Sequence, residues 1–385
     1  MHAKDLLRLI PEDKLKSLAI ETHVDHYAKK LDGLLMFQLI LFSFLNRKRV
    51  SLRVMEEFLR SSSFRHLSDH PDIDAKYNSL SERISLINAD FFEQIFYFVY
   101  DTFIKYFDEG SLIHRYDSTM VAVSSKLFNW GMRVGPKSRT DKKQLKFTMG
   151  MHGDLPSYLQ VFSNQTELAE DVALGEVIKK DTKNRNQVVV FDRGLKKKNT
   201  FEEFSNDHIG FVTRTFADIR YTLIKKNKVG KKAKGSTVTI TKDITIKLKH
   251  ERKKANKNIY RLIEATIDKT GEKIFFLTNL EEFSAYEIAA IYKLQWLIEI
   301  FFKFLKQELN IEHMVSRNAN GVKVMMYMTL IAAILIIAFK KLNNIQSFKI
   351  AKLRFALQIE ELIIRQIVFL TGGDTERLSL IFNDS

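Results

Sequence analysis

The 385-residue chain contains no cysteine and only four prolines. The absence of cysteine excludes disulfides, thiolate metal ligands and cysteine nucleophiles, and it fits a reducing cytoplasm. The scarcity of proline leaves no obvious flexible linker. The sequence also lacks a Gly-x-x-x-x-Gly-Lys-Ser/Thr phosphate loop. Its chemistry is therefore not expected to require an ATP site.

Long uncharged runs are rare as well. The most apolar segment, 324–339, has sixteen uncharged residues between Lys323 and Lys340. It is shorter than the ~20 residues that cross a bilayer, so we expect a buried core helix, with a transmembrane helix as the alternative. The N-terminus lacks the apolar stretch and cleavage site of a signal peptide. These features predict a cytoplasmic protein without a membrane partner.

Positive charge is abundant and unevenly distributed. The chain is 45% hydrophobic, enough for a sizeable core, and its net charge is +15. Segment 220–257 contains fourteen Lys or Arg residues against Asp243 and Glu251, which gives it a charge of +12. The segment is either a solvated lysine-rich β-hairpin or a surface for a nucleic-acid backbone. The basic character of the whole chain favours nucleic acid.

The periodicity of the sequence changes near Gly110. Before it, apolar spacing predicts helices, and Arg47-Lys48-Arg49 before Ser51 suggests either a DNA-facing helix or a surface loop. After it, alternation predicts strands and one amphipathic helix, 167–180. The expected strands are 112–123, 145–152, 158–162, 188–191 and 210–215. Strands alternating with helices predict an α/β domain, and 221–280 reads as a β-rich insertion.

Four polar side chains recur at helical spacing near residue 300. Tyr292, Gln295, Glu299 and Lys306 lie three, four and seven residues apart, which places them on one face of a helix predicted over 286–309. Leucine, isoleucine and phenylalanine fill the opposite face. Among the acids of this segment the spacing selects Glu299, because Glu308 falls with the apolar residues. The alternative for Glu299 is a surface salt bridge to Lys303.

Two aspartates lie on predicted strands. Asp117 lies inside the first strand, where an isolated charge is costly, so it either faces a pocket or metal or bonds backbone amides near the strand end. Asp192 follows the apolar strand 188–191, at the strand end where open α/β sheets place their chemistry. Capping of a following helix is its alternative.

Oxygen ligands without cysteine suit Mg²⁺ or Mn²⁺ better than zinc. Two such ions about 4 Å apart activate an attacking oxygen and stabilise a leaving oxygen at a phosphodiester. The histidines at 114, 152 and 313 are scattered through the sequence and are interpreted as structural.

Four blocks in order resemble bacterial insertion-sequence DDE transposases. They are Tyr-Asp-Ser-Thr at 116–119, Val-Val-Phe-Asp-Arg-Gly at 189–194, Phe-Val-Thr-Arg at 211–214 and Tyr-Lys-Leu-Gln-Trp-Leu-Ile-Glu-Ile-Phe-Phe-Lys at 292–303. The resemblance implies an α/β fold: an RNase H-like mixed five-stranded sheet flanked by helices, with a β-rich insertion and an N-terminal helical domain. The implied parts are a DNA-binding helical region 1–108, core segments 109–218 and 283–345, the basic insertion 219–282 and a helical tail 346–385.

The resemblance also implies roles for individual residues. Asp117, Asp192 and Glu299 would be catalytic and would hold two Mg²⁺ or Mn²⁺ ions. The implied DNA-binding residues are Tyr292, Gln295, Trp296, Lys306, Arg193 and Arg214. Gln295 departs from the family, which has arginine there, and glutamine cannot replace a charged bidentate phosphate contact.

The aromatic residues near the signature helix have weaker implied roles. Trp296 either packs against DNA bases or is a partly buried indole. Phe275 or Phe276 would hold an extruded base, unless both are ordinary core residues of a strand.

The implied activity is endonucleolytic DNA transposition and recombination. Cut-and-paste transposition would begin with strand cleavage at terminal inverted repeats, pass through a hairpin and end in strand transfer into target DNA. The implied partners are double-stranded DNA and a second copy of the chain in a synaptic complex, at the nucleoid of a bacterial cytoplasm. The rival interpretation is an inactive or repurposed transposase-derived DNA-binding protein.

Overall fold

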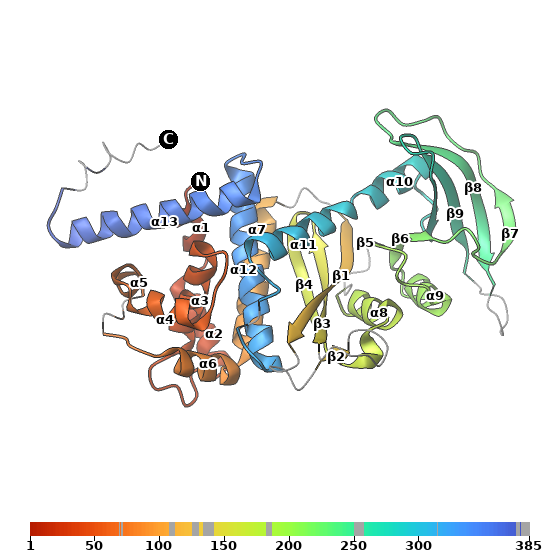
Figure 1. The fold of residues 1–385 in the computed structure, drawn as a ribbon. Coiled ribbons are helices and arrows are strands. Elements are labelled where there is room, and N and C mark those ends of the chain that lie inside the picture. The colour runs from red at the N-terminus through yellow and green to blue at the C-terminus, as the bar shows by residue number, and fades with distance from the viewer. Residues whose placement is uncertain are drawn as a thin grey trace. The chain divides into compact units, whose positions relative to one another are not determined.

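The computed structural model describes residues 1–68, 70, 72–107, 112–124, 131–133, 142–181, 187–249, 258–313, 315–374 and 378. The chain divides into two compact units. One contains Met1–Phe107, Val123–Trp130 and Lys303–Ser385, and the other contains Asp108–Ala122 and Gly131–Phe302. The first is mainly helical and the second is built on a sheet (Figure 1).

The N-terminal part of the first unit is helical, as predicted. Its helices are α1 (Ala3–Arg8), α2 (Glu12–Glu21), α3 (Gly33–Asn46), α4 (Leu52–Arg60), α5 (Ser62–Leu67), α6 (Tyr77–Leu86) and α7 (Ala89–Phe107). The start of α3 is fixed by Asp32, whose side chain accepts a hydrogen bond from the Leu35 amide. Nearly all of α3 is buried, which explains its continuous apolar sequence.

The long apolar segment forms the buried helix α12 (Ala319–Leu342). Asn318 caps it by accepting a hydrogen bond from the Gly321 amide. By length and composition alone this helix is able to cross a membrane, but 94% of its most apolar window is buried within the protein. It packs against α7, α3 and the final helix α13 (Phe348–Leu370). The prediction of a core helix is confirmed.

A buried lysine joins helix ends in the same unit. Lys352 of α13 is 7% exposed. Its Nζ donates to the carbonyl oxygen of Arg47, after α3, at 3.0 Å and to that of Glu308 at 2.6 Å. Glu308 ends α11 (Trp296–Glu308), so the ammonium group satisfies carbonyls that have no partner inside their own helices. Burial lowers the pKa of Lys352 to about 8.

This lowered pKa predicts a dependence of stability on pH. The unfolded chain, where lysine has a pKa of about 10.4, binds more protons than the folded chain between pH ~8 and ~10.5, so the free energy of unfolding rises with pH in that window. Relative to Lys352→Met, the wild type should gain up to about 3 kcal/mol across it, measured by urea denaturation. The exposed Lys349→Met variant is the control, and it should follow the wild type. A pH-independent difference between Lys352→Met and wild type would contradict the assignment.

The second unit is built on one mixed sheet. Its strands are β1 (Ile113–Ser124), β2 (Met132–Arg133), β3 (Lys142–His152), β4 (Leu155–Phe162), β5 (Val188–Phe191), β6 (Gly210–Thr215), β7 (Tyr221–Lys226), β8 (Val238–Leu248), β9 (Tyr260–Ile267) and β10 (Lys273–Thr278). The order is β3-β1-β5-β6-β10-β9-β8-β7, with β2 and β4 both paired to β3. β5 lies between β1 and β6 and is parallel to both, whereas β6 and the strands of the insertion pair antiparallel.

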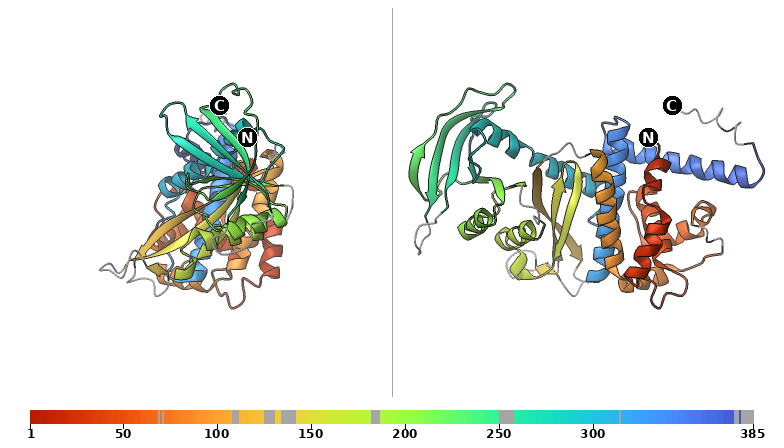
Figure 2. Two further views of the ribbon diagram at one scale, coloured as in Figure 1. Left: turned by 90° about the vertical axis from the view of Figure 1, so that its right-hand side faces the viewer. Right: turned by 180° about the vertical axis from the view of Figure 1, so that it is seen from behind.

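Helices cover both faces of the central strands (Figure 2). On one face, Val189 and Phe191 of β5 pack in a cluster with α8 (Glu170–Asp181) and α9 (Lys198–Asn206). On the other, Val188 and Val190 pack with α10 (Ala285–Lys293). A central strand covered on both faces needs apolar residues at every position, and β5 has them. The predicted mixed sheet flanked by helices is confirmed.

The insertion differs from expectation in how it is attached. Strands β4, β3, β1, β5 and β6 form the predicted five-stranded core, but β10 pairs antiparallel with β6. The insertion therefore extends the core sheet, and ten strands are joined within the described part of the chain. Helices α12 and α13 belong to the same compact unit as the N-terminal helices. The predicted five-part division remains a prediction.

Candidate active site

Strand register places the two aspartates side by side. β1 and β5 are parallel, and their last paired residues are Tyr116 and Phe191. Asp117 follows Tyr116 and Asp192 follows Phe191, so the register places both aspartates on the same face of the sheet. Neighbouring strands lie about 4.8 Å apart. Thr213 of β6 pairs with Phe191, so Arg214 continues the same row.

Helix α10 adds a phenol to this row. The Tyr292 hydroxyl donates to Asp192 Oδ1 at 3.0 Å, and Arg214 lies near it. The Tyr292 ring lies 5.3 Å from that of Phe276, centroid to centroid. Burial raises the pKa of Tyr292, and the Asp192 charge raises it further, against a smaller opposing effect of Arg214. The phenol therefore stays protonated and orients the Asp192 carboxylate.

This contact predicts a graded loss of activity in Tyr292→Phe. Removing the hydroxyl deletes a hydrogen bond to a charged group, which contributes about 1.5–3 kcal/mol, but retains the ring packing on Phe276. The kcat of the reaction at this site should fall about 10- to 100-fold, with the melting temperature nearly unchanged. Tyr286→Phe on the same helix is the matched control. An equal kcat for wild type and Tyr292→Phe would show that the hydroxyl does not orient Asp192 during turnover.

The single helix predicted over 286–309 is wrong. α10 ends at Lys293 and α11 begins at Trp296, and the turn between them is closed by bonds from the Gln295 amide to the Tyr292 carbonyl and from the Ile298 amide to the Gln295 carbonyl. Gln295 lies in this break and is only 4% exposed. Its Nε2 donates to the Tyr116 carbonyl at 2.9 Å, while Arg115 Nη1 donates to the Leu294 carbonyl at 3.4 Å. Both bonds hold the break against β1, immediately before Asp117.

Gln295 is nearly buried in this structure, and its DNA-binding role stays a prediction. Its Oε1 is buried without a hydrogen-bond partner among the described residues. Gln295 therefore acts as a support for the break between the two helices, and sequence spacing alone did not indicate this.

Glu299 lies in the first turn of α11 and is exposed. Partial burial raises its pKa, and the negative charge of Asp192 raises it further, so the two carboxylates lie within electrostatic range of each other. Among the described residues Glu299 forms no ion pair, so the predicted alternative of a bridge to Lys303 receives no support. Glu308 lies at the other end of α11.

The structure also bears on the alternative interpretations of the two aspartates, which are helix capping for Asp192 and backbone bonding for Asp117. Lys197 occupies the N-cap position of α9, five residues after Asp192, so Asp192 does not cap that helix. Asp117 accepts a hydrogen bond from the Ser118 amide at 2.7 Å, which agrees with the alternative that it bonds backbone amides. Its side chain is half-buried and lies in the row with Asp192. The two interpretations of Asp117 are compatible.

The carboxylates do not form a closed metal cluster. In the part of the chain that the structure describes, no group of three or more His, Asp or Glu side chains is placed to hold a metal ion. The donor chemistry nevertheless fits a hard divalent cation, which prefers carboxylate oxygens. The negative charge of Asp192 contributes to the raised pKa of Glu299, and a bound cation would offset this repulsion between the two carboxylates.

The remaining predicted DNA-binding residues differ in exposure. Trp296 is 62% exposed, which leaves its indole accessible, and both of its predicted roles stay predictions. Arg193 is exposed and its guanidinium group lies 5.3 Å from the centre of the Phe216 ring. Lys306 Nζ lies 3.6 Å from Glu312 Oε1. Phe276 is only 1% exposed.

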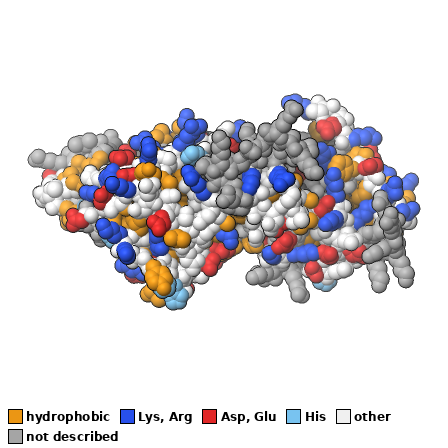
Figure 3. All heavy atoms as spheres, turned by 60° about the horizontal axis from the view of Figure 1, so that its bottom comes forward, with side chains coloured by type: hydrophobic (Ala, Val, Ile, Leu, Met, Phe, Trp, Pro, Cys, Tyr) orange, Lys and Arg blue, Asp and Glu red, His pale blue; other side chains and the backbone are white. Residues whose placement is uncertain are grey.

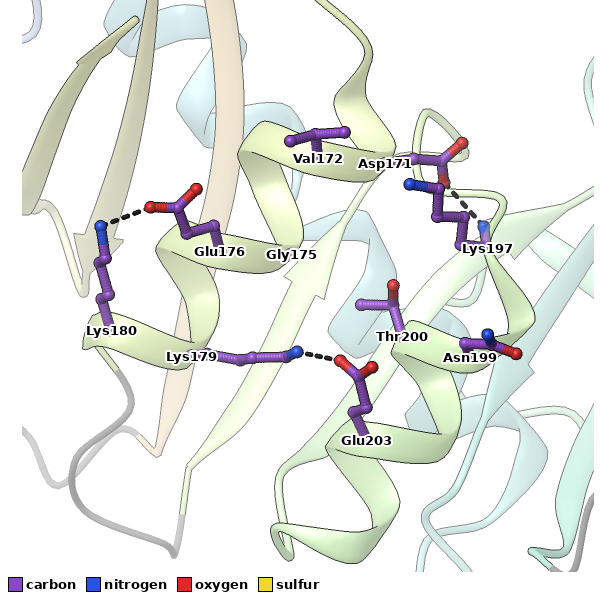
Figure 4. Close-up of a pocket in the computed structure, with 10 residues that line it drawn as sticks. All are labelled: Asp171, Val172, Gly175, Glu176, Lys179, Lys180, Lys197, Asn199, Thr200 and Glu203. Atoms are coloured by element: carbon purple, nitrogen blue, oxygen red, sulfur yellow. Dashed lines mark hydrogen bonds and ion pairs between the residues drawn. The ribbon is translucent and has the colours of Figure 1, made fainter. Parts of the chain in front are cut away.

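A pocket of about 730 Å³ adjoins Glu299, and the sequence did not indicate it. It is walled by the loop before β8, by β10 and by the break between the helices; its lining includes Arg214, Lys234, Gly235, Phe276, Tyr286, Tyr292, Trp296 and Glu299. A second pocket, between α8 and α9, contains none of the predicted site residues. Figure 4 shows its charged side chains paired, Lys180 with Glu176 and Lys179 with Glu203.

Comparison with known proteins gives the family of the chain. The family model described as the transposase DDE domain matches residues 116–335, more than half of the chain. The chain is 25% identical over 236 residues to a putative transposase, y4zB, of Sinorhizobium fredii, covering 61% of the chain and 63% of that protein. It is 26% identical over 220 residues to a probable transposase for insertion sequence element IS5377 of Geobacillus stearothermophilus, covering 57% and 54%.

The chain thus spans between half and two thirds of the length of these relatives. A solved piggyBac transposase synaptic complex with hairpin DNA is 10% identical, with a TM-score of 0.49 over 95% of this chain and 82% of that one. The family match covers the strand carrying Asp117, the end of β5 and both helices around the break. The chain belongs to the transposase DDE domain family.

Proposed function

We propose that this transposase cuts DNA at the terminal inverted repeats of an insertion sequence, using Asp117, Asp192 and Glu299. The observation that carries the proposal is the row of Asp117 and Asp192 on paired parallel strands, with Glu299 close enough for Asp192 to raise its pKa. Families of this kind use divalent metal ions, and the three carboxylates would hold two Mg²⁺ or Mn²⁺ ions. When bound, the ions supply positive charge that activates the attacking oxygen and stabilises the leaving oxygen.

The protein's own residues position these carboxylates. Tyr292 fixes one oxygen of Asp192 through its hydroxyl, and Arg214 contacts that hydroxyl from β6. Gln295 bonds the backbone next to Asp117 and so sets where α11 begins, one turn before Glu299. A phosphodiester placed over this row would meet Trp296 and Arg193 at its margin, both of them exposed.

The basic insertion is the second part of the proposed DNA surface. Most of its described lysines are exposed, as are Lys225 and Lys226 on β7 and Lys228 beyond it. At the right of Figure 3, where β7 to β9 lie, lysine and arginine side chains (blue) are prominent. Asp243 does not offset them, because it is 3% exposed and paired with Arg261. Residues 250–257 of the basic segment lie outside the described residues.

Phosphate contacts by this surface predict a change in salt dependence. The double variant Lys225→Gln and Lys226→Gln should bind DNA more weakly, and the slope of log Kd against log salt should fall by up to about 1.8. The control is Lys179→Gln with Lys180→Gln, because those lysines already pair with Glu203 and Glu176. Fluorescence anisotropy over a salt series measures both slopes. Equal slopes for the two double variants would remove β7 from the DNA surface.

Later steps of the reaction follow from the same proposal. The freed 3′ hydroxyl attacks the opposite strand to give a hairpin, which is reopened before strand transfer into target DNA. Two copies of the chain join two ends in a synaptic complex at the nucleoid. These steps rest on the family resemblance, and the N-terminal helices would help to grip the repeats.

The test is cleavage of a DNA duplex ending in the repeat that flanks the gene. Wild-type protein should nick it in Mg²⁺ or Mn²⁺ and not in EDTA, and Asp192→Ala should bind the repeat without nicking it. Sequencing gels report the position of the cut. If the wild type binds the repeat and never cuts it in either metal, the chain is a repurposed DNA-binding protein, which is the competing function.

A further inference from the structure

The pocket beside Glu299 has an apolar interior that a DNA-binding surface does not explain. Its walls include Ile267 and Ile274, on strands of the insertion, and Ala289 and Ala290, on α10. A DNA backbone is bound by cations and polar donors, and an apolar wall supplies neither. With a volume of about 730 Å³, such a pocket is typical of a small-molecule site. Aromatic side chains complete its lining: Phe276, Tyr286, Tyr292 and Trp296.

The loop before β8, which forms one wall of the pocket, is held in place by its own bonds. The Ser236 amide donates to the Ala233 carbonyl at 3.1 Å and so closes a turn. Gly235, inside this turn, has a φ of +80°, a backbone conformation that suits glycine. Lys232 Nζ lies 2.8 Å from Asp268 Oδ2, which ties the loop to the end of β9. A ligand that enters between fixed walls binds without the cost of ordering a loop.

The lining of the pocket is positively charged as well as apolar. Its described side chains include three cations, Arg214, Lys234 and Lys293, and one acid, Glu299. Lys234 and Lys293 are exposed, and neither forms an ion pair among the described residues. Their charges are therefore available to a negative group on a ligand. The chemistry that matches this lining is an apolar body with one anionic group.

We propose that this pocket binds a small aromatic anion, and that the bound molecule inhibits the protein by keeping DNA away from Glu299. Aromatic rings suit the ligand because aromatic side chains in the lining favour stacked or edge-on contacts with other rings. The volume of the pocket accommodates roughly two or three rings. The inhibitory effect rests on the proposed function, since it requires that DNA reach Glu299, whereas binding of the anion does not.

Fluorescence titration with anilinonaphthalene sulfonate, an aromatic anion that emits strongly in apolar sites, tests the pocket on the full chain without DNA or metal. Ala290→Trp fills the pocket from an exposed helix position and should remove one saturable dye site per chain. Its control is Ala217→Trp, which is also exposed and lies outside the lining. Lys234→Met should weaken dye binding about threefold, because it removes one exposed charge. Lys231→Met, in the same loop and outside the lining, should bind as the wild type does.

The inhibitory effect is measured separately, by the anisotropy of red-labelled repeat DNA in EDTA. The dye should raise the Kd of the wild type for this DNA and should leave the Kd of Ala290→Trp unchanged. A Kd of the wild type that does not respond to the dye would overturn the inhibitory role.

Two results of the dye titration would overturn the ligand site itself. They are equal numbers of dye sites in the wild type and in folded Ala290→Trp, and equal dye affinity in the wild type and Lys234→Met. If circular dichroism shows Ala290→Trp unfolded, Lys234→Met with its control decides alone. Cleavage of repeat DNA without dye separates this inference from the proposed function. A wild type that cuts DNA and binds no dye in the pocket rejects only the ligand site, and one that binds dye and never cuts rejects only the transposase chemistry.

Discussion

Glu299→Gln is expected to reduce metal-dependent DNA cleavage by more than ~1,000-fold, because Glu299 is one of the carboxylates proposed to hold the metal ions and its loss would remove several kcal/mol of transition-state stabilisation. Glutamine keeps the size of the side chain and removes only the charge. Glu308→Gln, on the same helix, is the matched control and should retain activity within about threefold of the wild type. The two acids lie in the first and last turns of α11.

Single-turnover cleavage on a repeat-containing duplex measures this difference. Repeat binding in EDTA, measured beside it, should be at least as tight in Glu299→Gln as in the wild type, because the substitution removes a negative charge next to the DNA. Comparable losses of cleavage in both glutamine variants would indicate that α11 as a whole matters and that Glu299 holds no metal. Full activity of Glu299→Gln would remove it from the catalytic set.

The central strands were predictable from the sequence because their signals are local. Strand 188–191 is continuously apolar and ends at an acid, and the structure places β5 at those residues. Strand 210–215 likewise matches β6. Buried parallel strands need apolar side chains on both faces, so composition alone marks them. The side-by-side placement of Asp117 and Asp192 then follows from the register.

The break between α10 and α11 was not predictable in the same way. Residues 286–309 keep a helical apolar pattern through Leu294 and Gln295, and no glycine or proline interrupts it. The break is stabilised by bonds to β1, more than 170 residues earlier, from Arg115 to the Leu294 carbonyl and from Gln295 to the Tyr116 carbonyl. Tertiary hydrogen bonds of this kind override local propensity and leave no periodic signal.

The pairing of the insertion with the core sheet was also not predictable from the sequence. Alternating residues predict that β8, β9 and β10 are strands but not which strand each one joins. The pairing of β10 with β6 aligns Phe276 with Arg214, which places the insertion beside the carboxylate row. Arg261 of β9 reinforces that attachment. It is 8% exposed and donates to the carbonyl oxygens of Leu280, at 3.3 Å, and Phe283, just before α10.

Arg261 also neutralises a buried acid, which predicts a large loss of stability when it is replaced. Its Nη2 donates to Asp243 Oδ2 at 2.6 Å, and Asp243 is 3% exposed. Arg261→Met leaves the Asp243 charge buried and unpaired, which should cost about 3–5 kcal/mol in the free energy of unfolding of the sheet unit. Urea denaturation followed by hydrogen exchange in β8 and β9 measures the loss.

The double variant Asp243→Asn with Arg261→Met separates charge from packing. Asparagine removes the buried charge and still accepts the hydrogen bond from Asn227 Nδ2, which lies 2.9 Å from Asp243 Oδ1. If the unpaired charge causes the loss, the double variant should recover at least half of it, because replacing both partners of a buried pair costs far less than removing one. A double variant as unstable as Arg261→Met would instead assign the loss to the bonds that Arg261 makes to Leu280 and Phe283. Those bonds anchor the start of the helix that carries Tyr292, so cleavage would then fall together with stability.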